Sequence, residues 1–223
     1  RGFEKLGKEL VRDGIMVAAE HFRIDSAIDW AQRLRWDGVP RVATFFSRYM
    51  GAEDRPYVRA VAMYLWTALA ARCLDPGHKA DMVPVLISRQ GTGKTSMVAA
   101  LAPAPEAFVE INLQTDEDKL ARMLRGKLVA EIAELRGING RDAESIKAWI
   151  SRRYEEWVPK YVEHATRFAR RMVLIGTHNK DEFLDDETGE RRWLPLRVGK
   201  GDMEALRADV EQLWAEAVEL FDA

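Results

Sequence analysis

A glycine-rich loop that ends in Lys94 and Thr95 is the segment of this chain whose residue types are best suited to chemistry. It follows an apolar run, 83–87, and precedes a helix-like stretch. In such a loop, glycines let backbone N–H groups converge on phosphate oxygens, and the N-terminal end of the next helix adds positive potential. Lys94 would reach the β- and γ-phosphates of a nucleotide, and the Thr95 hydroxyl would hold Mg²⁺. The sequence therefore predicts a nucleotide-binding loop made of Gln90, Gly91, Thr92, Gly93, Lys94, Thr95 and Ser96.

One position of the loop departs from the pattern G-x-x-x-x-G-K-[ST]. Ser88 stands where the first glycine is usual. Gly91, Gly93, Lys94 and Thr95 are all present, so we expect the departure to lower phosphate affinity only slightly. The alternative interpretation is a surface turn that has this sequence by chance.

Two acidic residues, Glu131 and Glu134, lie at the end of the apolar run 128–132. Phosphoryl-transfer sites place there an acid that orders Mg²⁺ and a base that orients the attacking water. Residues three apart cannot both point inward from one regular strand. We therefore favour Glu134, just past the strand, as the principal acid for Mg²⁺ and water, with Glu131 as its helper. The alternative is a pair of solvated glutamates at a sheet edge.

Polar residues also follow the next expected strand, 172–175. Thr177 or Asn179 could hydrogen-bond the γ-phosphate or the attacking water, because ligands bind at the carboxyl edge of such sheets. The alternative is an ordinary turn. Arg191 and Arg192 lie on a loop between two strands, which we expect near the phosphate edge. They suit an arginine finger acting in cis or across a subunit boundary, or else a surface ion-pair cluster.

The order of the remaining segments predicts an α/β fold. Strands alternating with helices indicate a mostly parallel five-stranded sheet with helices on both faces. We expect strands at 83–88, 108–111, 128–132, 172–175 and 193–198, and helices at 27–34, 56–74, from 94, 116–124, 142–157 and 203–221. Thr115 and Asp118 would form a capping box for the helix at 116–124. The expected domains are a helical one over 1–80 and a P-loop ATPase domain over 81–223.

The composition narrows the class of protein. The chain has 223 residues, of which 47% are apolar and 31% charged, and a net charge of −2. Its single cysteine, Cys73, cannot form an intrachain disulfide, which favours a reducing compartment. No stretch has the length and apolarity of a membrane span, and no signal-peptide pattern is present. We therefore expect a cytoplasmic protein whose contact with nucleic acid depends on local basic clusters.

One stretch of the chain has such a cluster. Basic residues are interleaved there with aromatic residues, which suits a strand of phosphates and bases. Neighbouring glutamates dilute the charge, and helical aromatics are commonly core residues. The candidate DNA-binding residues are Lys147, Arg152, Arg153, Lys160, Arg170 and Arg171.

Several separated motifs occur together in this chain. They are Trp36-Asp37-Gly38-Val39-Pro40-Arg41, Gln90-Gly91-Thr92-Gly93-Lys94-Thr95, Glu131-x-x-Glu134-Leu135, Lys147 with Ser151 ahead of Pro159-x-Tyr161, Arg170-Arg171, Gly176-Thr177-x-Asn179 and Leu184-x-Asp186-x-Thr188-Gly189-x-Arg191-Arg192. In this order they resemble the virulence-associated E family of phage and plasmid P-loop ATPases, relatives of superfamily 3 helicases. Besides Ser88, two residues depart from the family pattern: Glu155 replaces a usual aspartate, and His178 replaces a more usual threonine.

The resemblance implies a P-loop NTPase of the AAA+ or superfamily 3 type that uses ATP and Mg²⁺. Its implied role is an ATP-hydrolysing motor, a helicase or helicase-like ATPase, in phage, prophage or plasmid replication within a bacterial host cell. Relatives form homo-oligomeric rings, usually hexamers, around single-stranded or forked DNA, and an upstream primase domain is common. The alternative is a nucleotide-regulated DNA-binding initiator or adaptor without unwinding activity. A nucleotide kinase also stays open, whereas the order of motifs disfavours a small GTPase.

Overall fold

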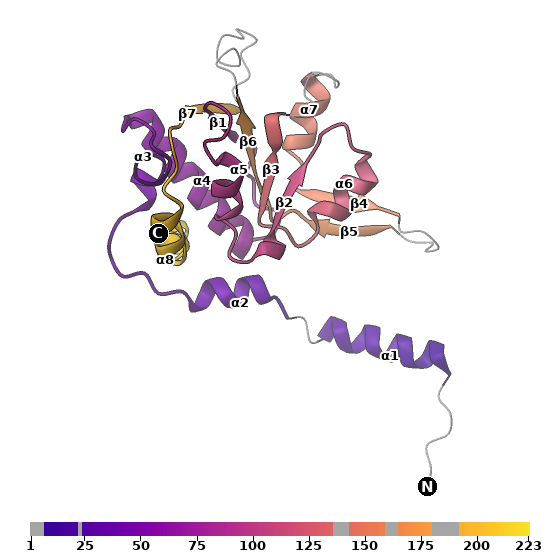
Figure 1. Cartoon of the computed structure of the whole chain (residues 1–223). Coiled ribbons are helices and arrows are strands. Elements are labelled where there is room, and N and C mark those ends of the chain that lie inside the picture. Colours follow the sequence, from indigo (N-terminus) through magenta and orange to yellow (C-terminus); the bar gives the residue numbers. More distant parts are fainter. Residues whose placement is uncertain (1–6, 22–23, 136–142, 159–164, 180–191) are drawn as a thin grey trace.

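A computed structural model describes residues 7–21, 24–135, 143–158, 165–179 and 192–223 (Figure 1). The helices are α1 (Lys8–His21), α2 (Ser26–Arg33), α3 (Phe45–Met50), α4 (Pro56–Leu74), α5 (Lys94–Ala99), α6 (Glu117–Leu124), α7 (Ala143–Ile150) and α8 (Met203–Asp222), with short 3₁₀ turns η1 (Val42–Thr44), η2 (Pro105–Ala107) and η3 (Ala133–Leu135). The strands are β1 (Val83–Ile87), β2 (Phe108–Ile111), β3 (Val129–Ile132), β4 (Tyr154–Trp157), β5 (Thr166–Ala169), β6 (Val173–His178) and β7 (Trp193–Arg197). In these described segments no helix is both long enough and apolar enough to cross a membrane.

Five of the strands form one sheet in the order β2-β3-β6-β1-β7, and every neighbouring pair is parallel. The expectation of an α/β fold with a mostly parallel five-stranded sheet is therefore confirmed. Because the strands are parallel, their carboxyl ends share one edge of the sheet. The strand that precedes the glycine loop, β1, lies between β6 and β7, so β6 separates it from the acidic strand β3.

Helices cover both faces of the sheet, because alternate strand residues point to opposite sides. On β1, Leu86 packs into the cluster formed with α2, α3, α4, α5 and α8, whereas Val85 and Ile87 pack into the cluster formed with α6 and α7. The same alternation on β3 places Val129 in the first cluster and Ile132 in the second. Glu131 has the parity of Val129 and therefore faces the helix that follows the glycine loop.

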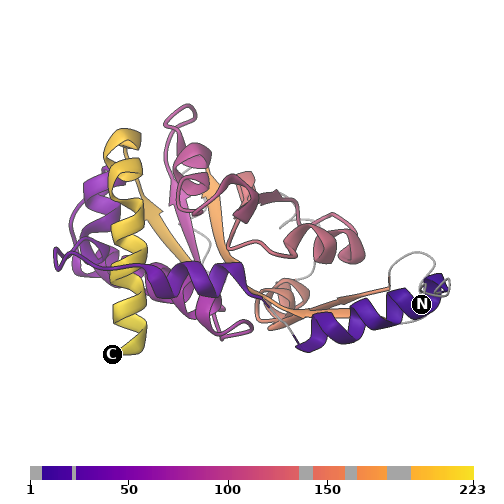
Figure 2. The same cartoon turned by 90° about the horizontal axis from the view of Figure 1, so that it is seen from below.

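The helices before residue 80 share their core with the sheet and with the C-terminal helix. Trp66 of α4 packs edge-on against Trp214 of α8, with ring centroids 6.0 Å apart, and against Phe45, 5.2 Å away. Trp30 of α2 contacts the same Trp214 ring at 5.3 Å, and Figure 2 shows α2 crossing near α8. The boundary expected at residue 80 therefore precedes the sheet but is not a break in the hydrophobic core.

Two local predictions were wrong. The helix expected over 142–157 ends at Ile150, and Tyr154–Trp157 instead pairs with Thr166–Ala169 as an antiparallel ribbon. The residues of β4 are alternately exposed and buried, which is the period of a strand rather than a helix. The capping box was also misplaced. Asp116, not Thr115, caps α6, because its carboxylate accepts a hydrogen bond from the Lys119 N–H.

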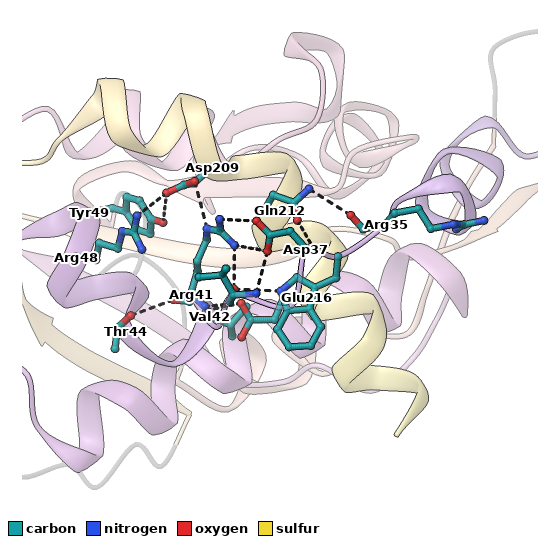
Figure 3. A network of polar contacts seen from close by, with 12 residues as sticks. Arg35, Asp37, Arg41, Val42, Thr44, Arg48, Tyr49, Asp209, Gln212 and Glu216 are labelled. Atoms are coloured by element: carbon teal, nitrogen blue, oxygen red, sulfur yellow. Dashed lines mark hydrogen bonds and ion pairs between the residues drawn. The ribbon is translucent and has the colours of Figure 1, made fainter.

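The Trp36–Arg41 motif has a structural role, which Figure 3 shows. The Arg41 guanidinium binds both carboxylate oxygens of Asp37 at 2.8 Å and reaches Asp209 of α8 at 3.2 Å. A second carboxylate of α8, Glu216, accepts hydrogen bonds from the backbone N–H groups of Arg41 and Val42, at 2.6 and 2.9 Å. The motif thus fastens the start of η1 to the C-terminal helix.

Replacing Arg41 by alanine is expected to lower the free energy of unfolding by about 2–4 kcal/mol, because a largely buried cation with several charge-assisted hydrogen bonds is removed. Arg41 is only 8% exposed. Chemical denaturation measures the change. Arg35→Ala is the matched control, since the Arg35 side chain is exposed and bonds to carbonyls of its own helix end, Gln32 and Leu34. It should change stability by no more than about 0.5 kcal/mol. Equal losses in the two variants would contradict this role for the motif.

Candidate active site

The loop from Ser88 to Gly93 connects β1 to α5 at the carboxyl edge of the sheet. Gly91 and Gly93 have φ values of +83° and +84°, a left-handed conformation that side chains disfavour. The loop borders a cavity of about 240 Å³. Its lining is Gln90, Gly91, Thr92, Gly93, Lys94, Thr95, Ser96, Glu110, Ala133, Glu134, Thr177 and Asn179. The structure thus brings all the predicted loop residues together with Glu134 and Asn179, and it adds Glu110, which is not among the residues predicted from the sequence.

Lys94 is held above the loop by oxygen atoms from two strand ends. Its Nζ donates to the Ser88 carbonyl at 2.9 Å, to the Arg89 carbonyl at 3.2 Å and to Asn179 Oδ1 at 2.9 Å. Burial lowers the pKa of Lys94, while the charges of Glu131 and Glu134 oppose that shift. The ammonium group therefore lies where the ends of β1 and β6 meet.

Ser88, the departure from the usual loop pattern, needs no glycine at its position. Among the residues that the structure describes, the non-glycine residues with positive φ are Glu134 and Leu135, so Ser88 has an ordinary backbone conformation. Its hydroxyl lies 2.6 Å from Thr92 Oγ1 and accepts a hydrogen bond from Lys94 Nζ at 3.1 Å. The Ser88 hydroxyl thus stabilises the loop through contacts with two of its side chains. Its effect on phosphate affinity stays a prediction.

Glu131 is fully buried beside the first residues of α5. Its Oε1 accepts hydrogen bonds from Thr95 Oγ1 at 3.0 Å and from Thr177 Oγ1 at 2.7 Å. Burial raises the pKa of Glu131, and the two hydroxyl groups partly offset the increase. Its Oε2 is buried without a hydrogen-bond partner among the described residues. A carboxylate oxygen left unpaired next to the loop threonine is suited to a hard divalent cation, which prefers oxygen ligands.

Glu134 reaches the same site by a different route. The regular strand ends at Ile132, and Glu134 and Leu135 then adopt left-handed conformations with φ of +52° and +48°. This turn brings Glu134 back to the cavity, where its Oε1 accepts a hydrogen bond from Asn179 Nδ2 at 3.3 Å. Both acids therefore reach the site. The expectation that one would point away assumed a regular strand, which does not extend that far.

Thr177 and Gly176 of β6 hold this acidic turn in place. Thr177 Oγ1 accepts a hydrogen bond from the Glu134 N–H at 3.2 Å and donates to Glu131. A Cβ at Gly176 would come within 2.6 Å of Leu135 Cδ2, so the absence of a side chain lets the turn pack on the strand. From the sequence, Thr177 is expected only to contact phosphate or water. In the structure it links the two acids.

Arg192 does not lie near the phosphate edge, and that prediction was wrong. Its carbonyl accepts a hydrogen bond from the N–H of Val83, the first residue of β1, whereas the glycine loop follows the last residue of that strand. Five strand residues separate the two edges by about 17 Å. The Arg192 guanidinium instead binds the Lys147 carbonyl at 2.6 Å and the Ser151 hydroxyl, at the end of α7. Arg191 lies outside the described residues.

The candidate DNA-binding residues are mostly engaged in contacts within the chain. Lys147 pairs with Glu144, Arg152 with Glu117, and Arg171 with Asp25, while Arg153 donates to the Gly77 carbonyl. Arg170 is fully buried, where it pairs with Glu155 and donates to the Trp149 carbonyl. Its assignment to a DNA-facing surface is therefore incorrect. Lys160 lies outside the described residues.

The fold and the site define an α/β protein with a parallel sheet and a glycine-rich, lysine-bearing loop at its carboxyl edge. The chain belongs to the Virulence-associated protein E-like domain family, which it matches over residues 31–223. The family that the sequence motifs indicated is thereby confirmed, whereas the ATPase activity that the resemblance implies stays a prediction. No curated protein sequence matches the chain.

Solved structures show the same fold. The apo structure of the NrS-1 C-terminal region aligns with a TM-score of 0.54 and 14% sequence identity, and covers 86% of this chain and 48% of that one. A second structure of the region, spanning its residues 305–718, gives 0.53 and 15%, with coverages of 85% and 47%. This chain spans about half the length of those chains. At these identities the similarity establishes the fold.

Proposed function

We propose that this chain is the ATP-hydrolysing motor domain of a phage, prophage or plasmid DNA replication system. The observation that carries the proposal is the convergence of four polar groups beside one glycine loop. Thr95 Oγ1 lies 3.0 Å from Glu131 Oε1, and Lys94 Nζ lies 2.9 Å from Asn179 Oδ1. Phosphoryl transfer to water uses groups of these kinds around a phosphate-binding loop: a cation, a hydroxyl, a carboxylate and an amide. Membership of the family supports the replication role, and the similarity to the NrS-1 region supports the fold on which the proposal rests.

The residues fit ATP with Mg²⁺, and the geometry favours Glu131 over Glu134 as the acid that holds the metal together with Thr95. Bound Mg²⁺ would neutralise charge that develops on the β- and γ-phosphates. Glu134, which is exposed to the cavity, is placed to orient the attacking water and to take its proton. Lys94 stabilises the transferred phosphate, and Asn179 positions both Lys94 and Glu134.

We further propose that the site is completed by a second copy of the chain. Arg192 lies at the amino edge of its own sheet, so it cannot reach its own phosphate loop without leaving α7. From that edge Arg192 would serve as an arginine finger for a neighbouring subunit in a ring. The same role is proposed for Arg191, which lies outside the described residues. A homo-oligomeric ring, usually hexameric in relatives of this kind, is therefore part of the proposal.

The proposed nucleic-acid partner, along which the motor would move, is single-stranded or forked DNA. The β4–β5 ribbon extends from the side of the body in Figure 1. On its exposed face, the Arg167 guanidinium lies 4.4 Å from the centre of the Tyr154 ring, and Tyr154 is 44% exposed. An arginine beside an exposed aromatic ring can contact both a phosphate and a base. In the complete replication protein, an upstream primase domain would supply the priming step.

The experiment that tests this function is ATP hydrolysis measured with and without single-stranded DNA over a range of protein concentrations. We expect DNA to stimulate hydrolysis, with a cooperative rise as subunits assemble.

Mixing Arg192→Lys with Lys94→Ala subunits should recover part of the activity, because some mixed interfaces pair an intact loop with an intact arginine. A rate of ATP hydrolysis that changes neither with DNA nor with protein concentration would overturn the ring-motor assignment. ATP-dependent DNA binding without strand displacement on a forked substrate would favour the initiator or adaptor.

Replacing Thr177 by valine is expected to lower kcat by about tenfold and to move the acidic limb of the pH–rate profile to higher pH. The Thr177 hydroxyl donates to Glu131 and so favours its ionised form, opposing the increase in pKa that burial causes. Without this donor the pKa rises further, and Glu131 becomes protonated, and inactive, at a higher pH. Thr177→Ser keeps the donor and should restore the wild-type profile. A valine variant with an unchanged profile would contradict this role.

A further inference from the structure

The first helix, α1, carries an apolar face that is exposed to solvent among the residues that the structure describes. Leu10, Val11, Ile15 and Val17 are 62%, 43%, 63% and 57% exposed. With Ala18 they recur at helical spacings of three, four and seven residues and so form one continuous stripe. A helix of 14 residues is only marginally stable in water by itself. This helix therefore requires a partner surface.

Charged residues border the stripe on each side. Glu9 and Asp13, four residues apart, form an acidic edge, and Lys8 and Arg12 form a basic edge. Such a helix fits a groove with apolar walls and charges of both signs on its rim.

A groove of this kind lies at the amino edge of the sheet, opposite to the phosphate loop. Its volume is about 760 Å³, and its walls include Trp30, Pro76, Pro103 and Phe168. Two exposed charged residues, Arg125 and Glu106, stand at its rim. The proposed ATP chemistry uses none of these residues. The groove therefore serves another purpose.

We propose that α1 of one copy docks in the groove of a second copy. The acidic edge of the helix would face Arg125 and its basic edge would face Glu106. Figure 1 shows α1 pointing away from the body that carries the groove, with the groove wall beginning at Ile24, just after the helix. In the arrangement we propose, each copy donates a helix to one neighbour and accepts one from another, a head-to-tail contact that can close into a ring.

The docking lies partly outside the region common to the family. The family match begins at residue 31, whereas α1 and the start of the groove wall precede it. The groove and the ATP site also share no lining residue. The interface can therefore be tested without nucleotide.

Sedimentation velocity of the full chain tests the docking with two adjacent substitutions. Ile15→Asp puts a charge on the apolar stripe, whereas Met16→Asp adds the same charge on the polar face opposite to it. The two residues are 63% and 60% exposed, which makes the second a matched control. We expect concentration-dependent association in the wild type and in Met16→Asp, and at least about tenfold weaker association in Ile15→Asp. A wild type that stays monomeric, or equal behaviour of the two variants, would overturn the proposal.

Cysteine cross-linking identifies which groove the helix occupies. The native Cys73 is buried, so it does not compete with introduced thiols. Chains with Val17→Cys mixed with chains carrying Ala104→Cys at the groove should form a disulfide-linked dimer on mild oxidation. Placing both substitutions in one chain tests the alternative. A disulfide confined to the monomer would show that α1 folds back on its own groove, and the docking between copies would then be wrong.

Discussion

Replacing Lys94 by alanine is expected to reduce ATP turnover by at least about a hundredfold. The Lys94 ammonium contacts both the glycine loop and Asn179, directly after β6. It is the group that would meet the charge developing on the transferred phosphate. Steady-state hydrolysis measures the loss, and titration with a fluorescent ATP analogue shows how much of it arises from weaker binding.

Lys119→Ala is the control for this variant, because Lys119 is an exposed lysine on α6, away from the loop. Its turnover should match the wild type. Thermal unfolding of both variants verifies that they remain folded. Retention of most of the ATPase activity in Lys94→Ala would remove the basis of the proposed function, while leaving the docking of α1 between copies untouched.

The strands and long helices could be predicted because their apolar residues follow a regular period. The helix 56–74 begins at Pro56, a residue favoured in the first turn, and its observed bounds equal the predicted ones. The five strands of the sheet were found from short apolar runs between helices. Their spatial order could not be predicted, since it depends on contacts between segments far apart in the chain.

The parts of the site that could not be predicted depend on irregular backbone. A glutamate with a left-handed backbone conformation is uncommon, and no sequence pattern predicts the turn at Glu134. Its conformation depends on Gly176 and Thr177, which lie more than forty residues away along the chain. The glycine at 176 is the available signal, because a glycine inside a strand often marks close approach of another segment.

Arg192 shows a second limit of prediction from sequence. A loop between two parallel strands must cross from the carboxyl edge of one to the amino edge of the next, so residues near its end lie far from the phosphate edge. Applying this rule to the position of Arg192, directly before β7, would have placed it correctly. If Arg192 is an arginine finger, as we propose, it therefore acts on the site of a neighbouring subunit.

Glu131→Gln and Glu134→Gln are expected to separate metal binding from catalysis. Glutamine at 131 can still accept hydrogen bonds from Thr95 and Thr177, but it has no charge and places an amide where the unpaired Oε2 now lies. Affinity for the Mg²⁺ complex of ATP should fall by about 10- to 100-fold. Affinity for ATP measured in EDTA should change little. Because a buried charge is removed, the variant should be at least as stable as the wild type.

Glutamine at 134 should have the opposite effect. The side chain can still accept the hydrogen bond from Asn179, so the turn is kept, and binding of the Mg²⁺ complex should stay within about threefold of the wild type. The value of kcat should fall by about 10²- to 10³-fold, because no base remains to take the proton of the attacking water. If instead Glu134→Gln loses the metal and Glu131→Gln does not, the assignment first made from the sequence is correct. The burial of Glu131 beside Thr95 would then have only a structural role, and the left-handed turn at Glu134 would exist to bring a metal ligand, rather than a base, to the phosphate loop.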